Sequence, residues 1–287
     1  MVDIKITPIE ESRISQVDFT SLVFGKEFSD YMFVCAYREG RWQQPEIKPY
    51  APISLMPSAS VFHYGQAVFE GMKAYKDEAG RVFLFRPWEN YRRLNRSCER
   101  LAMPAFPEEW FDAGLKQLLG LDKEWIKQGV GNSLYIRPFM IATSAGVKAS
   151  AATEYLFVII TSPVQSYYDG DVKVKIADYY SRAANGGFGY AKAAGNYAGQ
   201  FFPTAEAAKE GYQQVMWTDD ATHEFLEESG TMNLYFRIAD KLITCPVSER
   251  ILDGVTRKSI LELAPRLGSE TEVRKVRVQE LIKASEN

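Results

Sequence analysis

One lysine stands alone among glycine, alanine and aromatic residues in the stretch 186–197. No acidic residue lies within six positions of Lys192 on either side. Apolar surroundings remove water from an ammonium group and favour the neutral amine, a nucleophile that forms Schiff bases with carbonyl compounds. The glycines leave room for a flat, phosphorylated ligand to approach the backbone. The stretch therefore indicates either a reactive lysine or a glycine-rich surface turn whose lysine points into water.

The length and charge of the chain narrow the function classes. With 287 residues the chain is long enough for two domains. Its net charge is -3, and acidic and basic residues are interspersed along the whole sequence. No long basic tract indicates nucleic-acid binding, and no acidic tail indicates a solvating arm. These features favour a small-molecule enzyme or binding protein without nucleic-acid partners.

Cysteine and histidine usage points to the compartment and argues against a metal site. Cys35, Cys98 and Cys245 are widely spaced and form no CxxC pair, which fits a reducing compartment. With two histidines in the chain, a histidine-rich metal centre is not expected. Residues 1–10 lack the apolar core of a signal peptide, and no run approaches the length of a membrane span. We therefore predict a cytoplasmic protein without membrane association.

Hydrophobic periodicity predicts a two-domain α/β (α+β) protein. Apolar strands are expected at 31–37, 134–142 and 155–160, and amphipathic helices after Pro87 and over 108–127. A stretch with few large aliphatic residues then predicts an interdomain linker. We expect a first domain over 1–163, a linker over 164–171 and a second domain over 172–287, where the alternation of strands and helices restarts.

Several residues match what pyridoxal phosphate requires: an amine for its aldehyde, an anion for its ring nitrogen, a phosphate cradle and a donor to its ring oxygen. Lys192 supplies an amine, and Glu228 lies in a tight turn between apolar runs, where a carboxylate needs a cationic partner. The helix start at 254–256 suits phosphate, Arg93 could add a bidentate contact, and Tyr197 offers a phenol. Each residue alone also fits an ordinary loop or packing role; their joint occurrence favours the cofactor.

Several longer sequence motifs point to one family. In chain order, the motifs are His63-Tyr64, Phe69-Glu70-Gly71-Met72-Lys73-Ala74, Phe85-Arg86-Pro87-Trp88-Glu89-Asn90 with Arg93, Tyr135-Ile136-Arg137-Pro138, Lys192 with Gly195-Asn196-Tyr197, Glu228 with Gly230-Thr231-Met232-Asn233, and Leu252-Asp253-Gly254-Val255-Thr256-Arg257. This ordered set resembles the branched-chain amino acid aminotransferases, which are pyridoxal-phosphate enzymes of fold type IV.

The resemblance implies a homodimer in which each chain has a small α/β domain, a larger pseudo-barrel domain and pyridoxal 5'-phosphate between them. It implies that Lys192 bonds the cofactor's aldehyde and later carries a proton, and that Glu228 keeps the ring nitrogen protonated. Tyr197 would bind the ring oxygen. Arg93, Val255 and Thr256 would hold the phosphate, and Thr231 is expected to contact both cofactor and substrate.

The same resemblance implies a substrate pocket. Tyr64, Phe69 and Tyr135 would surround the side chains of leucine, isoleucine and valine, and Arg137 would meet the distal carboxylate of glutamate. Arg137 interrupts an apolar strand, so it is expected either on a solvent face or against an anion.

The expected reaction is transamination between branched-chain L-amino acids and 2-oxoglutarate. Family members continue past the position of Asn287 through a Gly-Thr-rich loop, so the larger domain is expected to lack its C-terminal part here. Two alternatives stay open: another fold-type IV enzyme, such as a D-amino acid aminotransferase or an aminodeoxychorismate lyase, or a truncated protein that dimerises without catalysis.

Overall fold

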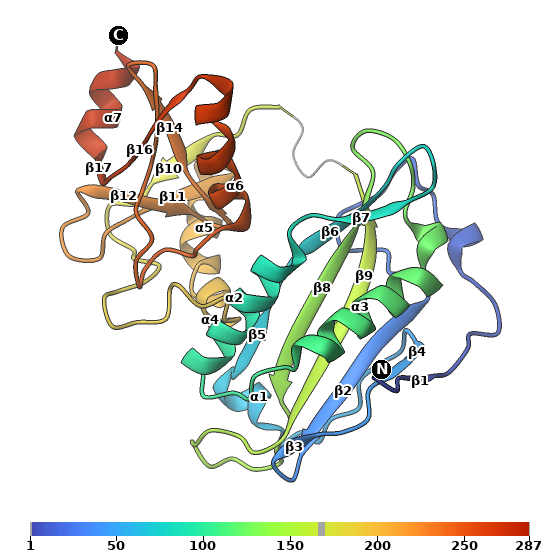
Figure 1. Ribbon diagram of the computed structural model, residues 1–287. Coiled ribbons are helices and arrows are strands. Elements are labelled where there is room, and N and C mark those ends of the chain that lie inside the picture. Colours follow the sequence, from blue (N-terminus) through green and yellow to red (C-terminus); the bar gives the residue numbers. More distant parts are fainter. Residues whose placement is uncertain (1, 166–169, 287) are drawn as a thin grey trace. The chain divides into compact units, whose positions relative to one another are not determined.

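The computed structural model describes residues 2–165 and 170–286. The chain divides into two compact units, Met1–Asp169 and Gly170–Asn287 (Figure 1). We call them the first and the second unit. Half of the expected linker, 164–171, falls on residues 166–169, which lie outside the described residues. Its first residue, Val164, belongs to the last strand of the first unit.

The described part of the first unit is built on one large, mainly antiparallel sheet. Its longest path runs β1-β4-β2-β9-β8-β6-β7, with β3 paired to β2 and β5 paired to β8. The strands are β1 (Lys5–Ile6), β2 (Tyr31–Arg38), β3 (Arg41–Trp42), β4 (Glu46–Pro49), β5 (Ala67–Phe69), β6 (Met72–Lys76), β7 (Val82–Leu84), β8 (Ser133–Ala142) and β9 (Tyr155–Val164). The three strands predicted from apolar runs are all confirmed, as β2, β8 and β9.

Strand β8 shows how the sequence assigns the two faces of this sheet. Its buried residues alternate with half-exposed ones from Leu134 to Ala142. Successive side chains of a strand point to opposite faces, so Leu134 and Ile136 pack into the core while Tyr135 and Arg137 share the other face. Phe69 of β5 pairs with Phe139 of β8 and therefore lies on the same face as Arg137.

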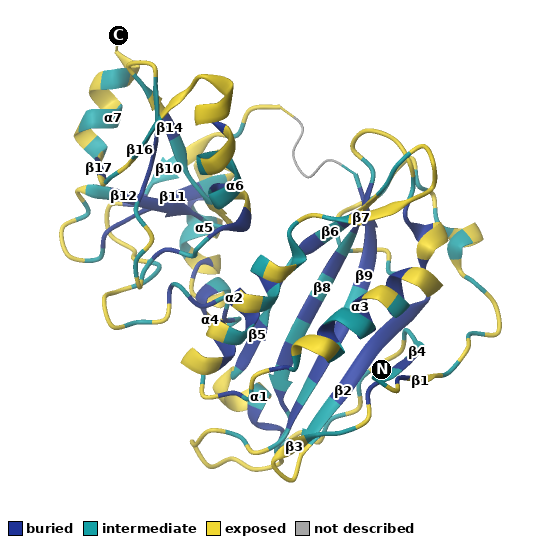
Figure 2. Cartoon of the chain, in the orientation of Figure 1, coloured by how far each residue is buried: buried dark blue, intermediate teal, exposed yellow. Residues whose placement is uncertain are grey.

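Two helices cover one face of the sheet, α2 (Pro87–Arg100) and α3 (Glu108–Leu121) (Figure 1). Leu94 and Cys98, from the stripe predicted for α2, are fully buried. Helix α3 approaches β2 closely, because a Cβ on Gly114 would lie 2.5 Å from the Phe33 ring. Figure 2 shows the buried inner side of each helix and its exposed outer side.

Two helical segments of the first unit differ from the sequence prediction. The helix expected over 108–127 ends at Leu121 and is followed by a short 3-10 turn, Lys123–Trp125. The segment before Gly65 forms a short helix, α1 (Ser60–Tyr64), which the sequence analysis does not predict. Gly65 ends α1 with φ 61°, a left-handed conformation that glycine adopts without strain. A second 3-10 turn, Ile14–Gln16, lies near the N-terminus.

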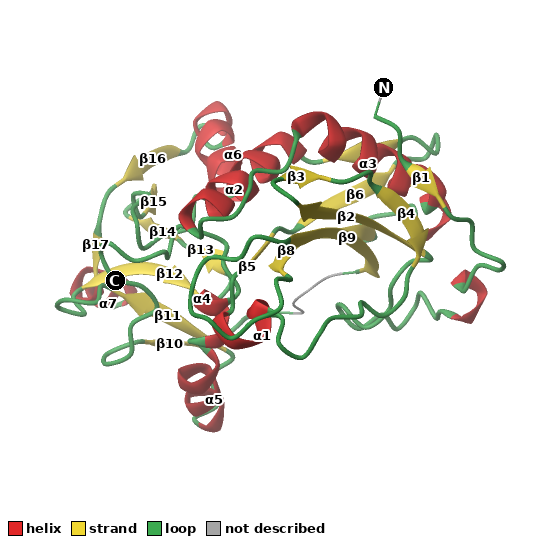
Figure 3. Ribbon diagram, turned by 90° about the horizontal axis from the view of Figure 1, so that it is seen from below, coloured by secondary structure: helices red, strands yellow, loops and turns green. Residues whose placement is uncertain are grey.

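The second unit combines two sheets with four helices among its described residues (Figure 3). One sheet has the order β10-β11-β12-β13, with β17 paired to β12, and the other has the order β14-β15-β16. The strands are β10 (Val174–Ile176), β11 (Gln214–Thr218), β12 (Phe225–Ser229), β13 (Met232–Asn233), β14 (Tyr235–Ile238), β15 (Lys241–Thr244), β16 (Glu270–Val273) and β17 (Val276–Arg277). The helices are α4 (Gly195–Ala198), α5 (Phe201–Lys209), α6 (Val255–Leu263) and α7 (Val278–Ser285), and a 3-10 turn spans Pro265–Leu267.

The core of the second unit joins its two sheets. Met216 and Leu226 from the first sheet pack with Phe236 and Ile243 from the second. Helix α5 packs on β11 through Ala207. The alternation of apolar and charged residues over 273–278 predicts a single strand, and this prediction is wrong: β16 ends at Val273, and Val276 joins the other sheet as part of β17.

Three other structural features bear on the sequence predictions. No helix among residues 2–165 and 170–286 is long and apolar enough to cross a membrane. All three cysteines are free and buried. Within the same ranges no cluster of three or more histidine, cysteine, aspartate or glutamate residues could hold a metal ion.

Two carboxylates are buried together where α3 ends. Asp122 accepts a hydrogen bond from the Ser29 hydroxyl at 2.7 Å. Asp30 accepts one from the Trp125 indole at 2.8 Å. Burial, together with the nearby charge of Asp30, raises the pKa of Asp122 to about 7, against the opposing effect of the Ser29 hydrogen bond. Asp122 is therefore more easily protonated in the folded chain than in the unfolded chain.

This difference predicts a pH-dependent stability. A carboxyl whose pKa is raised by folding stabilises the fold below its unfolded value, near 3.8, and loses that contribution as pH rises through about 7. Relative to Asp122→Asn, the wild-type unfolding free energy should fall by up to about 1.4 kcal/mol per pH unit in this window. Urea unfolding at pH 5, 6 and 7.5 measures it.

The control for this series is the exposed carboxylate of Asp18, whose pKa lies near 2 because the hydroxyls of Ser21 and Thr20 bind it. Asp18→Asn should run parallel to wild type between pH 5 and 7.5. Parallel curves for Asp122→Asn as well would contradict the assignment.

Candidate active site

Lys192 lies in the loop between β10 and α4, beside the phenol of Tyr197. Its Nζ donates a hydrogen bond to the Tyr197 hydroxyl at 2.7 Å and lies 5.2 Å from the centre of that ring. The side chain of Asn196 fixes the loop by donating to the carbonyls of Phe188 and Ala191, both at 2.9 Å. The lysine is half-buried, so its side chain does not point freely into water as the surface-turn alternative predicted.

Glu228 is buried on β12, the strand at the centre of the first sheet of this unit. Arg182 forms an ion pair with it at 2.6 Å, and both side chains are less than one-tenth exposed. The Asn233 amide and the Leu252 backbone N–H donate to its other oxygen at 2.9 and 3.2 Å. Glu228 therefore has the cationic partner that its sequence context required.

Burial raises the pKa of Glu228 to about 7, and three favourable groups oppose this effect. The largest is the charge of Arg182, followed by the Leu252 N–H and the charge of Lys192. Because the charge of Lys192 lowers the pKa of Glu228, the amine and the carboxylate lie within electrostatic reach of each other. A cation brought close to Glu228 would hold it ionised.

Helix α6 begins next to this carboxylate. Its N-cap is Gly254, and no side chain caps its first turn. The Asn233 side chain that binds Glu228 also binds the Leu252 carbonyl at 2.8 Å. The Asn233 side chain leaves no room for a side chain at position 254, because a Cβ there would lie 1.9 Å from the Asn233 Oδ1. The first-turn amides, at Val255 and Thr256, form the kind of anion site that helix N-termini provide.

Three predicted substrate residues come together in the first unit. The Arg137 guanidinium lies 4.5 Å from the centre of the Phe69 ring and donates to the Tyr135 hydroxyl at 2.8 Å. The Tyr135 phenol lies over the backbone of Gly71, where a Cβ would be 2.3 Å from its oxygen. No carboxylate within residues 2–165 and 170–286 pairs with Arg137. Its charge is thus partly buried between two aromatic rings, without an acidic partner in that part of the chain.

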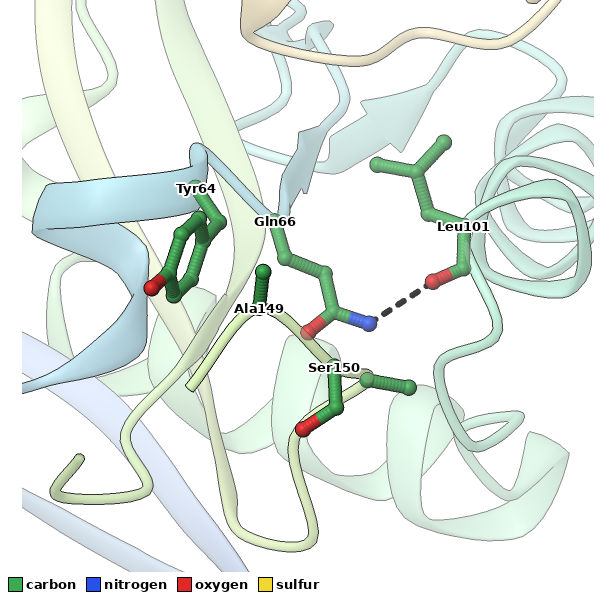
Figure 4. A pocket seen from close by; sticks show the side chains of 6 residues that line it. Tyr64, Gln66, Leu101, Ala149 and Ser150 are labelled. Atoms are coloured by element: carbon green, nitrogen blue, oxygen red, sulfur yellow. Dashed lines mark hydrogen bonds between the residues drawn. The ribbon is translucent and has the colours of Figure 1, made fainter. Parts of the chain in front are cut away.

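The other predicted residues lie elsewhere. Tyr64 ends α1 and donates to the Val147 carbonyl, at the edge of a shallow cavity of about 270 Å³ (Figure 4). Gln66 lines the same cavity and donates to the Leu101 carbonyl at 2.7 Å. Thr231 is exposed in the turn between β12 and β13. The predicted contacts of Tyr64 and Thr231 with ligands remain predictions.

Arg93 is not on a solvated helix face. Its Nε and Nη2 bind the two oxygens of Glu70 at 2.7 and 2.9 Å. Both side chains are less than one-tenth exposed. The Asn90 amide donates to Glu70 at 2.8 Å. Within the first unit Arg93 thus fastens α2 to the end of β5, and its predicted role as a phosphate ligand remains a prediction.

Comparison with known proteins decides the family. The model of the amino-transferase class IV family matches residues 67–287. This chain belongs to the class IV aminotransferases. It is 48% identical over 273 residues to the branched-chain-amino-acid transaminase 1 of Bacillus subtilis (strain 168), covering 93% of this chain and 77% of that protein. It is 45% identical over 271 residues to the branched-chain-amino-acid aminotransferase 2 of the same organism, covering 93% and 75%.

Solved structures agree on the fold of this class IV chain. The branched-chain aminotransferase of Thermoproteus uzoniensis with norvaline has a TM-score of 0.74 at 21% identity, covering 88% of this chain and 81% of that one. The PLP form of the enzyme from Thermobaculum terrenum has a TM-score of 0.73 at 23% identity, covering 89% and 80%. The predicted fold class, a fold-type IV α/β enzyme, is confirmed.

Class IV aminotransferases are pyridoxal-phosphate enzymes, and the donors of the second unit fit this cofactor. An amine and a phenol 2.7 Å apart suit an aldehyde next to a ring hydroxyl. The buried carboxylate of Glu228 suits a cationic ring nitrogen, and the start of α6 suits a phosphate.

Sequence reasoning missed the contact that completes the carboxylate site. Arg182 was not among the predicted residues, and Asn233 was noted only as part of a sequence motif. Neither has a local signature, since their role depends on Glu228 being close to both in space. A buried acid that lacks a cation nearby in the sequence was the available signal.

The Glu70–Arg93 pair predicts a large loss of stability when its acid is removed. Glu70→Gln takes the charged partner away from a buried guanidinium and should lower the unfolding free energy by about 3–5 kcal/mol. Glu89→Gln is the matched control, because it breaks a pair with Arg92, an exposed arginine on the same helix as Arg93, and should lower the unfolding free energy by about 1 kcal/mol or less. Urea unfolding measures both; similar losses would show that burial of the Glu70 pair is unimportant.

Proposed function

We propose that this protein transfers amino groups between branched-chain L-amino acids and 2-oxoglutarate, using pyridoxal 5'-phosphate. The reaction gives branched-chain 2-oxo acids and glutamate. The observation that carries the proposal is the Lys192–Tyr197 pair beside buried Glu228, in a chain 48% identical to a protein named branched-chain-amino-acid transaminase.

The cofactor accepts the amino group and withdraws electrons from the α-carbon when it is bound. Lys192 would supply the amine that holds its aldehyde, and would afterwards carry a proton between the α-carbon of the amino acid and the aldehyde carbon of the cofactor. Tyr197 donates to the ring oxygen while its hydroxyl orients the Lys192 Nζ.

Glu228 fixes a proton on the ring nitrogen, which makes the ring a better electron acceptor. The amides at Val255 and Thr256 would bind the phosphate, with Arg93 as a further predicted ligand. Thr231 is proposed to contact both cofactor and substrate from its exposed turn.

The residues of the first unit support the substrate class. Phe69 and Tyr135 offer aromatic surface to leucine, isoleucine and valine, and Tyr64 is proposed to add to it. The same residues must also accept glutamate, whose distal carboxylate carries a charge. Arg137 supports this second role because it lacks an acidic partner among the described residues.

We also propose that the chain acts as a cytoplasmic homodimer. Buried free cysteines are consistent with a reducing compartment. Exposed apolar side chains near α1, at Met56, Phe62 and Val147, offer surface to a second copy.

The test of the function is an amino-transfer assay with purified protein. Leucine with 2-oxoglutarate should give glutamate, and D-alanine should give none. Cofactor-loaded protein should absorb visible light, and borohydride should fix the cofactor to Lys192, as peptide mass spectrometry would show. Lys192→Ala should abolish both the amino transfer and the covalent attachment of the cofactor. Reaction with D-alanine but not leucine would favour the D-amino acid enzymes, and a colourless protein after cofactor addition would favour a non-catalytic one.

Arg137 gives a prediction on specificity. Arg137→Ala leaves the distal carboxylate of glutamate without a cation but does not affect a leucine side chain in the same way. We expect kcat/KM for glutamate to fall at least about tenfold more than kcat/KM for leucine, which corresponds to about 1.4 kcal/mol. Tyr135→Phe is the control: it keeps the charge of Arg137 and should leave the ratio within about threefold. Equal losses for both substrates in Arg137→Ala would remove Arg137 from this role.

A further inference from the structure

Residues 248–252 form a short loop before α6 that binds the backbone of the loop carrying Lys192. The Tyr190 N–H donates to the Glu249 carbonyl at 3.0 Å, and the Gly186 N–H donates to the Glu249 carboxylate at 2.8 Å. The Arg182 guanidinium donates to the carbonyls of Gly189, at 3.2 Å, and of Arg250. We call residues 248–252 the clamp loop, because these contacts fix residues 182–190 on one side of it.

The two loops touch without a gap at Gly189. A Cβ at this position would lie 2.8 Å from the Arg250 carbonyl oxygen and 2.9 Å from the Arg250 Cα. The backbone of the lysine loop therefore lies directly on the backbone of Arg250. A displacement of Arg250 would move Gly189, three residues before Lys192.

The clamp loop also holds β12, from both faces of that strand. Leu252 donates its N–H to Glu228, as described above. Arg250 donates from its Nε to the carboxylate of Glu227, the preceding residue of β12. Its Nη1 donates to the Asn185 side chain in the lysine loop. One guanidinium thus joins the lysine loop to the strand that carries Glu228.

The Arg250–Glu227 pair is buried, and its charge matters to the neighbouring acid. The two side chains are 13% and 5% exposed. Burial raises the pKa of Glu227, and Arg250 provides the largest opposing effect. The charge of Glu227 in turn raises the pKa of Glu228. Without Arg250, two adjacent buried carboxylates would share the positive charges of Arg182 and Lys192.

We propose that Arg250 is a positioning residue for the cofactor site: it holds the Lys192 loop against β12 and neutralises Glu227, so that Glu228 alone presents negative charge to the ring nitrogen. The Arg250 guanidinium acts through Asn185 and Glu227, with an oxygen of Asp220 3.7 Å from its Nε, while the Arg250 backbone lies against Gly189. This inference rests on the proposed function, because it takes Lys192 and Glu228 as the groups that bind pyridoxal phosphate.

The test compares the full chain with Arg250→Met and with Arg277→Met. Arg277 is the matched control, since it pairs with Glu224 next to β12 but both side chains are more than half exposed. Pyridoxal phosphate is titrated into each cofactor-free protein and followed by absorbance. Arg250→Met should raise the Kd at least about tenfold, and Arg277→Met should leave it within about twofold. Equal Kd values for the two variants would overturn the proposal.

Hydrogen exchange of the cofactor-free proteins gives a second readout that needs no bound ligand. The Tyr190 amide, which is bonded to the clamp loop, should exchange at least about tenfold faster in Arg250→Met and at the wild-type rate in Arg277→Met. Unchanged exchange at Tyr190 would show that Arg250 does not hold the lysine loop.

Two further variants separate positioning from general loss of folding. Arg250→Lys keeps a cation for Glu227 but cannot bind Glu227 and Asn185 together, so its Kd should lie between those of wild type and Arg250→Met. Adding Glu227→Gln to Arg250→Met removes the unpaired charge and should restore part of the affinity but not the slow exchange of Tyr190. No restoration would contradict the electrostatic half of the proposal. Wild type that fails to bind the cofactor through Lys192 would instead overturn the proposed function itself.

Discussion

A buried carboxylate with three donors organises the second unit. Glu228 is 5% exposed, and a charge at that depth is tolerated only when its oxygens are paired and hydrogen-bonded. Its donors come from three separate segments: the loop before Lys192, strand β13 and the residues leading into α6. The hydrogen bonds that these donors make to Glu228 therefore fix the lysine loop and the N-terminus of α6 relative to each other. The same set of contacts positions the amine, the carboxylate and the anion site.

The first unit uses buried charge in two contrasting ways. Arg93 is matched by the two oxygens of Glu70, and the pair holds α2 against the sheet. Arg137 lies on the face of β8 opposite the core, between aromatic rings, and pairs with no acid among residues 2–165 and 170–286. A matched pair stabilises the fold, whereas an unmatched cation lined by aromatic surface is suited to a substrate that brings both an apolar body and a carboxylate.

Local pattern predicted most elements, and its failures have identifiable causes. The stripe of α2 and the alternation of β8 were readable because burial on one face imposes a period on the sequence. Helix α1 was missed because its five residues are too few to show a period, and its end depends on the left-handed Gly65. The strand predicted over 273–278 was split because Val273 and Val276 join different sheets, a choice that sequence alternation does not encode.

Which groups are chemically able to act could be read from the order of residues along the chain. Lys192 and Tyr197 are five positions apart, so a single loop and the short helix after it bring them to 2.7 Å. The face of Arg137 follows from the two-residue period of its strand. The pairings that hold these groups depend on three-dimensional packing: Glu70 and Arg93 are 23 positions apart, as are Glu227 and Arg250, and Arg182 lies 68 positions before the Arg250 carbonyl that it binds. Contacts across such separations depend on how the elements pack, and any of the chain's many acids could have been the partner until the core was formed.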